Sequence, residues 1–238
     1  MPTLTAVMSE LKRKGKEQTR KIYARHGMDQ DRVYGVSVAD LKLIARTIKG
    51  QQNLACDLYE TGNMDAMYLA GLVADGSKLT REQLERWVES AVGLPMTSEY
   101  TVPWLAVENP LSRDLALDWM NSKVSAIAAS GWCTYAGLLA TKPDEDLDLN
   151  EIRSLLDRIL REISAAPNQV KSTMNNFVIA VGTYVKPLLK DAKTAATKLG
   201  AVDVDKGETD CKVPLASAYI DKAEKSGKVG KKRKTLRC

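Results

Sequence analysis

Aromatic residues are scarce in this sequence. Phe, Trp and Tyr make up 5% of its 238 residues, and Phe177 is the only phenylalanine. Hydrophobic residues still make up 44% of the chain, so a core has to be built from Leu, Ala, Val, Ile and Met. Such a core is typical of packed helices, whereas strand-rich sandwiches use more aromatic and β-branched residues. The composition therefore disfavours a β-sandwich and favours an all-helical protein.

Candidate metal ligands are also scarce. His26 is the only histidine, and the four cysteines, Cys56, Cys133, Cys211 and Cys238, form no CxxC pair. Because structural zinc sites need closely spaced Cys and His ligands, we expect no metal. The sequence has no Gly-rich phosphate loop, no HExxH and no GxSxG motif, and a Ser-His-Asp triad would have to use His26. We therefore expect no cofactor.

Long hydrophobic runs are absent as well. There is no apolar signal segment at the N-terminus, and no run approaches the roughly 20 residues that span a membrane. Widely spaced cysteines are then most simply reduced thiols. We expect a cytoplasmic protein without a membrane partner. The oligomeric state is left open, with a monomer as the expectation.

Positive charge is concentrated at the C-terminal end. The formal net charge is +5, and the segment from Lys222 to Cys238 holds eight cations and one acid. This segment therefore carries +7, and the remainder carries −2. Such a segment attracts polyanions, most often nucleic acid, although solubilising the chain end is the alternative role. The cations expected to contact DNA phosphates are Lys231, Lys232, Arg233 and Lys234.

Glycines, prolines and N-cap residues divide the first 200 residues into short helical segments. The first predicted helix runs from Thr5 to His26 and has a basic, solvated face. Later helix pairs begin near Ser37, Thr80, Pro110, Asp148 and Pro187, at spacings of 43, 30, 38 and 39 residues. Ser37 and Asp148 are expected N-caps, and Thr80 with Gln83 has the form of a capping box. These spacings are close to those of HEAT and armadillo repeats. We therefore predict an all-α, HEAT-like or armadillo-like α-α superhelix, a curved solenoid of antiparallel helix pairs.

The character of the sequence changes after Gly200. Residues 201–213 are polar, and a short helix is predicted from Leu215 to Ser226, directly after Pro214. The last residues are rich in glycine and cations, so we expect a flexible or ligand-ordered tail. The prediction is a helical-repeat domain over residues 1–200 and a C-terminal extension over residues 201–238.

The stretch from Asn168 to Tyr184 is unusual for a surface helix. At 3.6 residues per turn it sorts into an apolar side and a side of amides and hydroxyls. The polar side comprises Asn168, Lys171, Ser172, Asn175, Asn176 and Thr183. Amides are weak helix formers, but they offer both donors and an acceptor to a nucleic acid. Two interpretations stay open. Lys171, Asn175 and Asn176 contact DNA, or the two asparagines bond neighbouring helix ends inside the fold.

Five segments of the sequence resemble those of a known family. They are YGVSVADLKLIARTIK (34–49), LYETGNMDAMYLAGLVAD (58–75), SEYTVPWLAVEN (98–109), GWCTYAGLLATKPD (131–144) and PNQVKSTMNNFVIAVGTYVKPL (167–188). On these segments the chain resembles the DNA alkylation repair family of AlkD-type glycosylases, which are HEAT-like helical solenoids. The resemblance covers most of the chain up to about Gly200. The remaining tail resembles an extension found in one branch of the family.

The resemblance implies a DNA glycosylase. Members of the family hydrolyse the N-glycosidic bond of cationic N-alkylated purines, such as 3-methyladenine and 7-methylguanine, in double-stranded DNA. A cationic base is already a good leaving group, so the enzyme must chiefly stabilise an oxocarbenium-like sugar and position water. One carboxylate and aromatic faces for cation–π contact could suffice, with neither metal nor cofactor.

The resemblance also implies where the site lies. The family uses an aspartate shortly after paired tryptophans, and another tryptophan on a later helix. By helix order the first region corresponds to residues 95–104, which lack the tryptophan pair and contain Glu99 as the only carboxylate. Glu99 is therefore the implied catalytic residue, with Tyr100 and Trp104 on the substrate surface. A second alignment places the site at residues 131–136 and offers Trp132.

Each of these residues also has a structural interpretation. Glu99 could favour a helix start electrostatically, capped by Ser98. Trp104 and Trp132 could belong to the core, as aromatic residues at helical spacing usually do.

Three functions are compatible with these observations. The first is a DNA-binding alkylation-repair protein that acts as a metal-independent DNA glycosylase. The second is a non-catalytic HEAT-repeat protein that binds distorted or branched DNA by shape and phosphate contacts. The third is a protein-interaction scaffold. Base release separates the first two, and the placement of basic residues separates both from the third.

Overall fold

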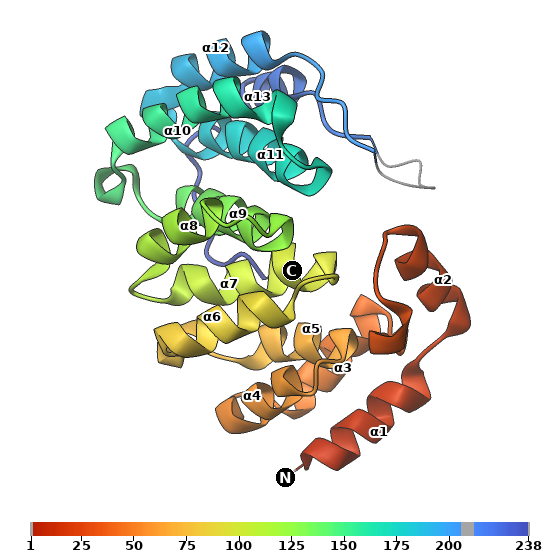
Figure 1. The fold of residues 1–238 in the computed structure, drawn as a ribbon. Helices are drawn as coiled ribbons and strands as arrows, with labels where there is room; N and C mark the ends of the chain where they lie inside the picture. The colour runs from red at the N-terminus through yellow and green to blue at the C-terminus, as the bar shows by residue number, and fades with distance from the viewer. Residues whose placement is uncertain (1, 206–211, 238) are drawn as a thin grey trace. The chain divides into compact units, whose positions relative to one another are not determined.

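The structure is a computed structural model that describes residues 2–205 and 212–237. Within these residues it contains helices and no β-strand, which confirms the predicted all-α fold (Figure 1). The α-helices of the described residues are α1 (Leu4–Lys14), α2 (Glu17–Arg25), α3 (Val38–Thr47), α4 (Gln52–Glu60), α5 (Met64–Val73), α6 (Arg81–Ser90), α7 (Val102–Glu108), α8 (Ser112–Met120), α9 (Ser125–Thr141), α10 (Leu149–Glu162), α11 (Asn168–Tyr184), α12 (Leu189–Leu199) and α13 (Ala216–Lys225).

Shorter helical segments connect several of these helices. The π-helical turn η3 (Thr97–Thr101) leads into α7. The others are η1 (Gln30–Arg32), η2 (Gly76–Lys78), η4 (Asp144–Asp146), η5 (Ile163–Ala165) and η6 (Lys186–Leu188).

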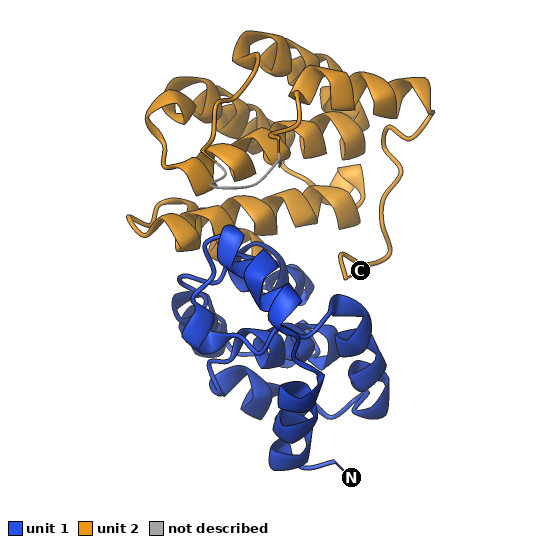
Figure 2. Cartoon of the chain, turned by 90° about the vertical axis from the view of Figure 1, so that its right-hand side faces the viewer, with its two compact units in different colours: residues 1–111, 207–209 blue, residues 112–206, 210–238 orange. Residues whose placement is uncertain are grey.

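Contacts within the chain divide it into two compact units (Figure 2). Of the described residues, unit 1 contains residues 2–111, and unit 2 contains residues 112–205 and 212–237. The boundary predicted at residue 200 concerns separately folding domains and stays a prediction. In unit 2, α13 of the predicted extension packs against α11 and α12.

The first predicted helix is two helices in the structure, α1 and α2, so that expectation was wrong. Helix α1 ends at Gly15, where an added Cβ would lie 2.3 Å from the Tyr34 carbonyl oxygen. The Lys16 amide then donates to the Gly35 carbonyl at 3.0 Å. The connector at residues 34–36 packs against the end of α1. Its carbonyl accepts a backbone amide that a continuous helix would have bonded within itself.

Local capping chemistry sets several of the helix starts, as predicted. The Ser37 hydroxyl accepts from the Asp40 amide at the start of α3. Thr80 and Gln83 form both bonds of a capping box at α6. Asp148 accepts from two amides at the start of α10. These caps satisfy amides that have no partner inside their own helix.

A buried aspartate organises the connector in unit 1. Asp65 in α5 is fully buried, and its carboxylate accepts the amides of Tyr34, Gly35 and Val36 at 2.7, 3.2 and 2.8 Å. Burial raises the pKa of the Asp65 carboxyl, and these amide bonds oppose the rise. The Tyr23 hydroxyl donates to the Val36 carbonyl at 3.1 Å. The connector is thus held from both sides.

The core of unit 2 is built around α9 and α11, which pack against each other. Phe177 is fully buried, and its ring meets those of Trp132 and Tyr135 edge-on, with centroids 5.2 and 5.7 Å away. Such edge-to-face pairs add to the stabilisation from apolar burial. The few aromatic residues of the sequence are therefore used here as core anchors.

The C-terminal segment, residues 226–237, lies along the ends of α9 and α11. The Gly230 amide donates to the Thr183 carbonyl at 2.9 Å, and the Arg233 amide donates to the Ala140 carbonyl at 2.7 Å. Helix C-termini leave carbonyls without partners, and this segment satisfies some of them. The tail was expected to be flexible or ordered by a ligand; over residues 226–237 it is an irregular segment held by backbone hydrogen bonds to the ends of α9 and α11.

The described residues contain no helix that is long and apolar enough to cross a membrane. Within residues 2–205 and 212–237 there is also no group of three or more His, Cys, Asp and Glu side chains that could hold a metal ion. Cys56 and Cys133 are thiols, and Cys211 and Cys238 lie outside the described residues.

Candidate nucleic-acid interface

Glu99 lies on the π-helical turn η3 in unit 1. The turn follows Leu94, whose carbonyl accepts the amides of Thr97 and Ser98 at 2.8 and 3.0 Å. Ser98 is fully buried, Glu99 is half-buried, and the next residue, Tyr100, is 50% exposed. π-helical turns are rare and occur frequently at functional sites. The turn places an acid and an aromatic side chain next to each other at the surface of unit 1.

A glycine in α5 allows the turn to approach. A Cβ added to Gly71 would lie 2.6 Å from the Thr101 Cγ2 atom, a separation that real Cβ atoms essentially never show. The hydroxyls of Thr97 and Thr101 are buried without a hydrogen-bond partner among the described residues. A buried unsatisfied hydroxyl costs stability, so maximal stability does not explain this conformation of the turn.

An aromatic row supports the same turn. The Trp104 ring meets Tyr100 edge-on at 6.1 Å and Tyr68 edge-on at 5.3 Å. Trp104 is only 6% exposed, so its ring packs against Tyr100 and is not accessible to a ligand. Of the three residues expected in this region, Glu99 and Tyr100 reach the surface, and Trp104 fits the core interpretation.

The polar side of α11 divides between interior and surface. Asn175 is fully buried, and its Nδ2 atom donates to the Pro214 carbonyl at 2.9 Å. Asn176 is exposed, and Lys171 is half-buried. A DNA contact from Asn175 is therefore not available in this structure, because the C-terminal extension covers that side of α11. The interior interpretation holds for Asn175, whereas Asn176 and Lys171 remain accessible.

Trp132 is fully buried in unit 2. Its ring packs against Phe177, and the Arg158 guanidinium carbon lies 5.7 Å from its centroid. A Cβ on the neighbouring Gly131 would lie 2.5 Å from the Met120 amide nitrogen, so α8 is in close contact there. A substrate contact from Trp132 is therefore not available in this structure, because the side chain serves the core.

The four cations expected in the C-terminal segment have two different environments. Lys231, Arg233 and Lys234 are exposed. Lys232 is only 19% exposed, and its Nζ atom contacts the Asp144 carboxylate at 2.8 Å and the Leu139 carbonyl at 2.9 Å. Lys232 therefore caps the end of α9, and the other three cations are available to a ligand.

Comparison with known proteins identifies the relatives of this chain. A family model described as DNA alkylation repair enzyme matches residues 7–195. The chain belongs to the DNA alkylation repair family. Two uncharacterized proteins, Lin0241 of Listeria innocua and Lmo0209 of Listeria monocytogenes, are each 33% identical to it over 230 residues, with 94% of this chain and 98% of each relative covered.

A solved structure supports the same assignment and the HEAT-like fold. It is 35% identical, with a TM-score of 0.90, and all of both chains is covered. That protein is described as belonging to a new family related to the HEAT-like repeat DNA glycosylases, with affinity for branched DNA structures. The predicted HEAT-like fold is confirmed.

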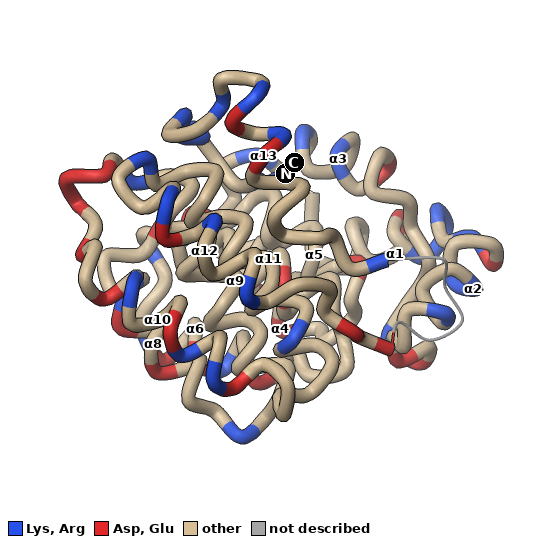
Figure 3. The backbone as a smooth tube through the Cα atoms, turned by 90° about the horizontal axis from the view of Figure 1, so that it is seen from above, with Lys and Arg blue, Asp and Glu red and all other residues tan. Residues whose placement is uncertain are grey.

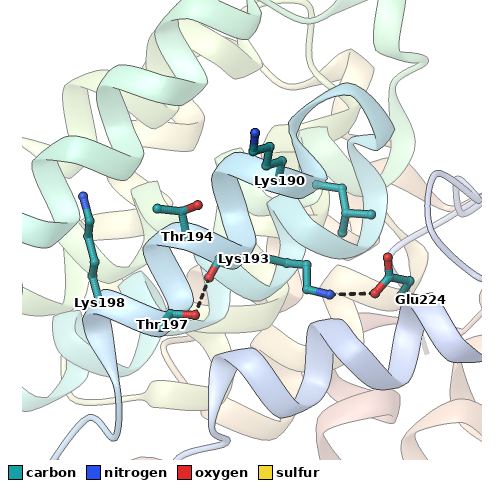
Figure 4. A pocket seen from close by; sticks show the side chains of 7 residues that line it. Lys190, Lys193, Thr194, Thr197, Lys198 and Glu224 are labelled. Carbon is teal, nitrogen blue, oxygen red and sulfur yellow. Dashed lines mark hydrogen bonds and ion pairs between the residues drawn. The ribbon is translucent and has the colours of Figure 1, made fainter.

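This family member also has a basic surface that the sequence did not single out. Lys190, Lys193, Thr194, Thr197 and Lys198 of α12 line a depression of about 560 Å³ together with Leu189 and Glu224 (Figure 4). In the sequence these residues belong to an ordinary amphipathic helix. The available signal was the repetition of Lys and Thr at positions that share one helix face.

Elsewhere the charges are mixed. Lys and Arg positions are interspersed with Asp and Glu positions over the described backbone (Figure 3). Several cations are paired with an acid, for example the exposed Arg153 with Asp191 at 3.3 Å and the half-buried Arg158 with Glu162 at 2.8 Å. Cations that lack such a partner are therefore the more informative candidates for a phosphate contact.

Proposed function

We propose that this protein binds DNA and prefers branched DNA over a linear duplex. The observation that carries the proposal is the full-length likeness to a protein with affinity for branched DNA. The likeness covers all of both chains, so it includes the C-terminal extension as well as the repeat region. Such a function fits the cytoplasmic location that the sequence predicts.

Exposed cations supply the phosphate contacts in this proposal. Lys231, Arg233 and Lys234 project from a segment whose backbone is held by α9 and α11. A held segment loses less conformational entropy on binding than a flexible tail. Each phosphate contact contributes about 0.9 to the slope of log K against log salt concentration.

The central experiment compares DNA shapes at constant sequence. Fluorescence anisotropy would measure Kd for a four-way junction, a three-way junction and a linear duplex assembled from the same strand sequences. We expect the junctions to bind about tenfold tighter or more. Equal affinity for the three DNAs, or no binding to any of them, would overturn the proposal.

A substitution tests the C-terminal cations. Changing Lys231, Arg233 and Lys234 together to Gln should reduce the salt slope by about 3, since three phosphate contacts are lost. Lys232 is left intact because its ammonium caps α9. An unchanged slope would remove this segment from the DNA interface.

A second candidate function is base excision, and the placement of Glu99 favours it. The acid is half-buried on a π-helical turn beside an exposed tyrosine, in a chain whose family is described as a DNA alkylation repair enzyme. In this reaction the bond between C1′ and the base nitrogen breaks, and its electron pair neutralises the cationic base. A carboxylate stabilises the positive sugar and accepts a proton from the attacking water.

Release of methylated bases tests this second function. Wild type should liberate 3-methyladenine or 7-methylguanine from methylated duplex DNA, and Glu99→Gln should reduce the rate about 100-fold or more, because the neutral amide stabilises the cationic sugar poorly. Equal release by both proteins would remove Glu99 from the chemistry. No release by either protein leaves DNA binding as the function.

A further inference from the structure

The exposed face of α12 differs from the other charged surfaces of unit 2. We call Lys190, Lys193, Thr194, Thr197 and Lys198 the α12 lysine face. All but the half-buried Lys193 are exposed, and together they border the depression of about 560 Å³. Threonine is a weak helix former, and it replaces the longer Glu or Arg that solvated helix faces commonly carry. Its short side chain keeps the space between the lysines open.

The charges on this face are only partly compensated. Lys193 points toward α13, where its Nζ atom contacts Glu224 at 2.7 Å and Asp221 at 2.9 Å (Figure 4). Lys190 and Lys198 instead project away from α13 (Figure 4), and neither forms an ion pair with another described residue. The one acid within α12, Asp191, is paired with Arg153 at 3.3 Å. Two cations therefore remain to attract an anion.

The spacing of these two cations suits a nucleic-acid backbone. Lys190 and Lys198 are eight residues apart, which is about 12 Å along a helix axis. The major groove of B-DNA is also about 12 Å wide, so the two ammonium groups can reach phosphates on both of its edges. The Thr194 hydroxyl lies between them and offers a donor to the same backbone.

The basic surface continues toward the C-terminal segment. Lys186 begins η6, is exposed, and precedes Lys190 by one helical turn. A Cβ on Gly230 would lie 3.2 Å from the Lys186 Cβ atom, so the C-terminal segment runs beside it. Lys228 and Lys231, on either side of that glycine, are both exposed. Two parts of the sequence, about 40 residues apart, thus lie side by side at Lys186.

The face points away from α11, the helix that carries the exposed Asn176. Ala192, Ala195 and Ala196 are buried, and α12 packs against α11. The lysines occupy the opposite side of α12. A straight duplex that meets Asn176 on α11 would therefore not meet Lys190 and Lys198 at the same time. A branched DNA has a second arm that can.

We propose that the α12 lysine face binds the phosphate backbone of a second duplex arm in a branched DNA. This inference rests on the proposed function and adds to it the surface that separates branched from linear DNA. The recognition is electrostatic and blind to base sequence, since it uses ammonium and hydroxyl groups on phosphates. The contact contributes to junction affinity and leaves the affinity for a single arm unchanged.

A double substitution tests the assignment. Lys190→Gln with Lys198→Gln removes both cations, and Lys123→Gln with Arg161→Gln removes the same charge from exposed positions elsewhere in unit 2. The Kd for a four-way junction and for a linear duplex of equal total length would be measured at several salt concentrations. We expect the first variant to bind the junction about tenfold more weakly, with a salt slope smaller by about 2. Its duplex affinity should stay within about twofold of wild type, and the control variant should match wild type on both DNAs.

Two results would overturn the inference. An equal loss on junction and duplex would mean that the face contacts the same duplex as the other cations. Unchanged affinity for both DNAs would mean that the face is not a DNA contact. A wild-type protein without junction preference would instead overturn the proposed function itself, so the two failures are distinguishable. Equal melting temperatures of the wild type and both variants would show that folding is unaffected.

Discussion

Tyr23 and Asp65 show what single buried residues contribute to this fold. Asp65 accepts three amides of the connector at residues 34–36, and Tyr23 donates to the last of these residues. Burial and the nearby charge of Asp65 raise the pKa of Tyr23 to about 12. A phenolate at this position would be shielded from water and repelled by the Asp65 carboxylate, so the folded state favours the neutral hydroxyl.

This shift predicts a loss of stability at high pH. The pKa of Tyr23 is 10.0 without the fold and about 12 within it, so the folded chain keeps a proton that the unfolded chain releases. The contribution is complete below pH 10 and is lost as the pH rises toward 12. Tyr23→Phe should therefore make the decline of the unfolding free energy between pH 10 and 12 shallower. Urea unfolding of both proteins at pH 8, 10 and 11 measures this, and parallel declines would contradict it.

The sequence predicts a residue's role well when its hydrogen-bond partner lies only a few positions away in the sequence. The caps at Ser37, Thr80 and Asp148 depend on residues within three positions, and all three are present. Asn175 bonds Pro214, which is 39 residues away. Helical periodicity places an amide on a face, but it carries no information about a later segment that covers that face.

The π-helical turn with Glu99 and the helix α5 illustrate the scale of the element. The resemblance and the order of the helices pointed to residues 95–104 as the site, because Glu99 is the only carboxylate there. The π-helical hydrogen bonding and the contact with Gly71 could not be read from periodicity, because both depend on how α5 packs against η3. The turn is held by a close fit rather than by polar bonds to its threonines.

The close fit predicts that Gly71→Ala disturbs the turn. The added methyl would lie 2.6 Å from the Thr101 Cγ2 atom, and overpacking of this kind costs about 1–3 kcal/mol. If η3 contacts DNA, the variant should lose junction affinity, or base release, by more than a surface variant of equal stability. Urea unfolding and anisotropy on the same preparations measure the two effects.

A second substitution provides the control for this prediction. Thr101→Ser removes the Cγ2 atom, so combining it with Gly71→Ala should recover part of both the stability and the affinity. Recovery of stability without recovery of affinity would separate the packing of the turn from its role in binding.

At the scale of the whole molecule, the C-terminal extension is the least predictable part. Repeat spacing and helix breakers are visible along the chain, and they led to the prediction of HEAT-like repeats. The extension looked like a polar linker, a helix and a charged tail. Its helix α13 nevertheless packs on α11 and α12, with Ala216 and Ile220 fully buried. The spacing of Ala216, Ile220 and Ala223 predicts an amphipathic helix, but it does not specify which surface that helix covers.

Removing the extension should therefore destabilise unit 2. A chain that ends at residue 200 loses the burial of Ile220 against Gly182 and leaves the Asn175 amide without its Pro214 partner. Together these losses amount to about 5 kcal/mol, or a fall in melting temperature of about 10–20 °C for a chain of this size. A chain that ends at residue 226 keeps α13 and loses only the bonds of the C-terminal segment, so its melting temperature should fall by much less. Calorimetry of the three chains measures the difference. An unchanged melting temperature for the shortest chain would instead mean that residues 1–200 fold as a separate domain and that the extension only docks onto it.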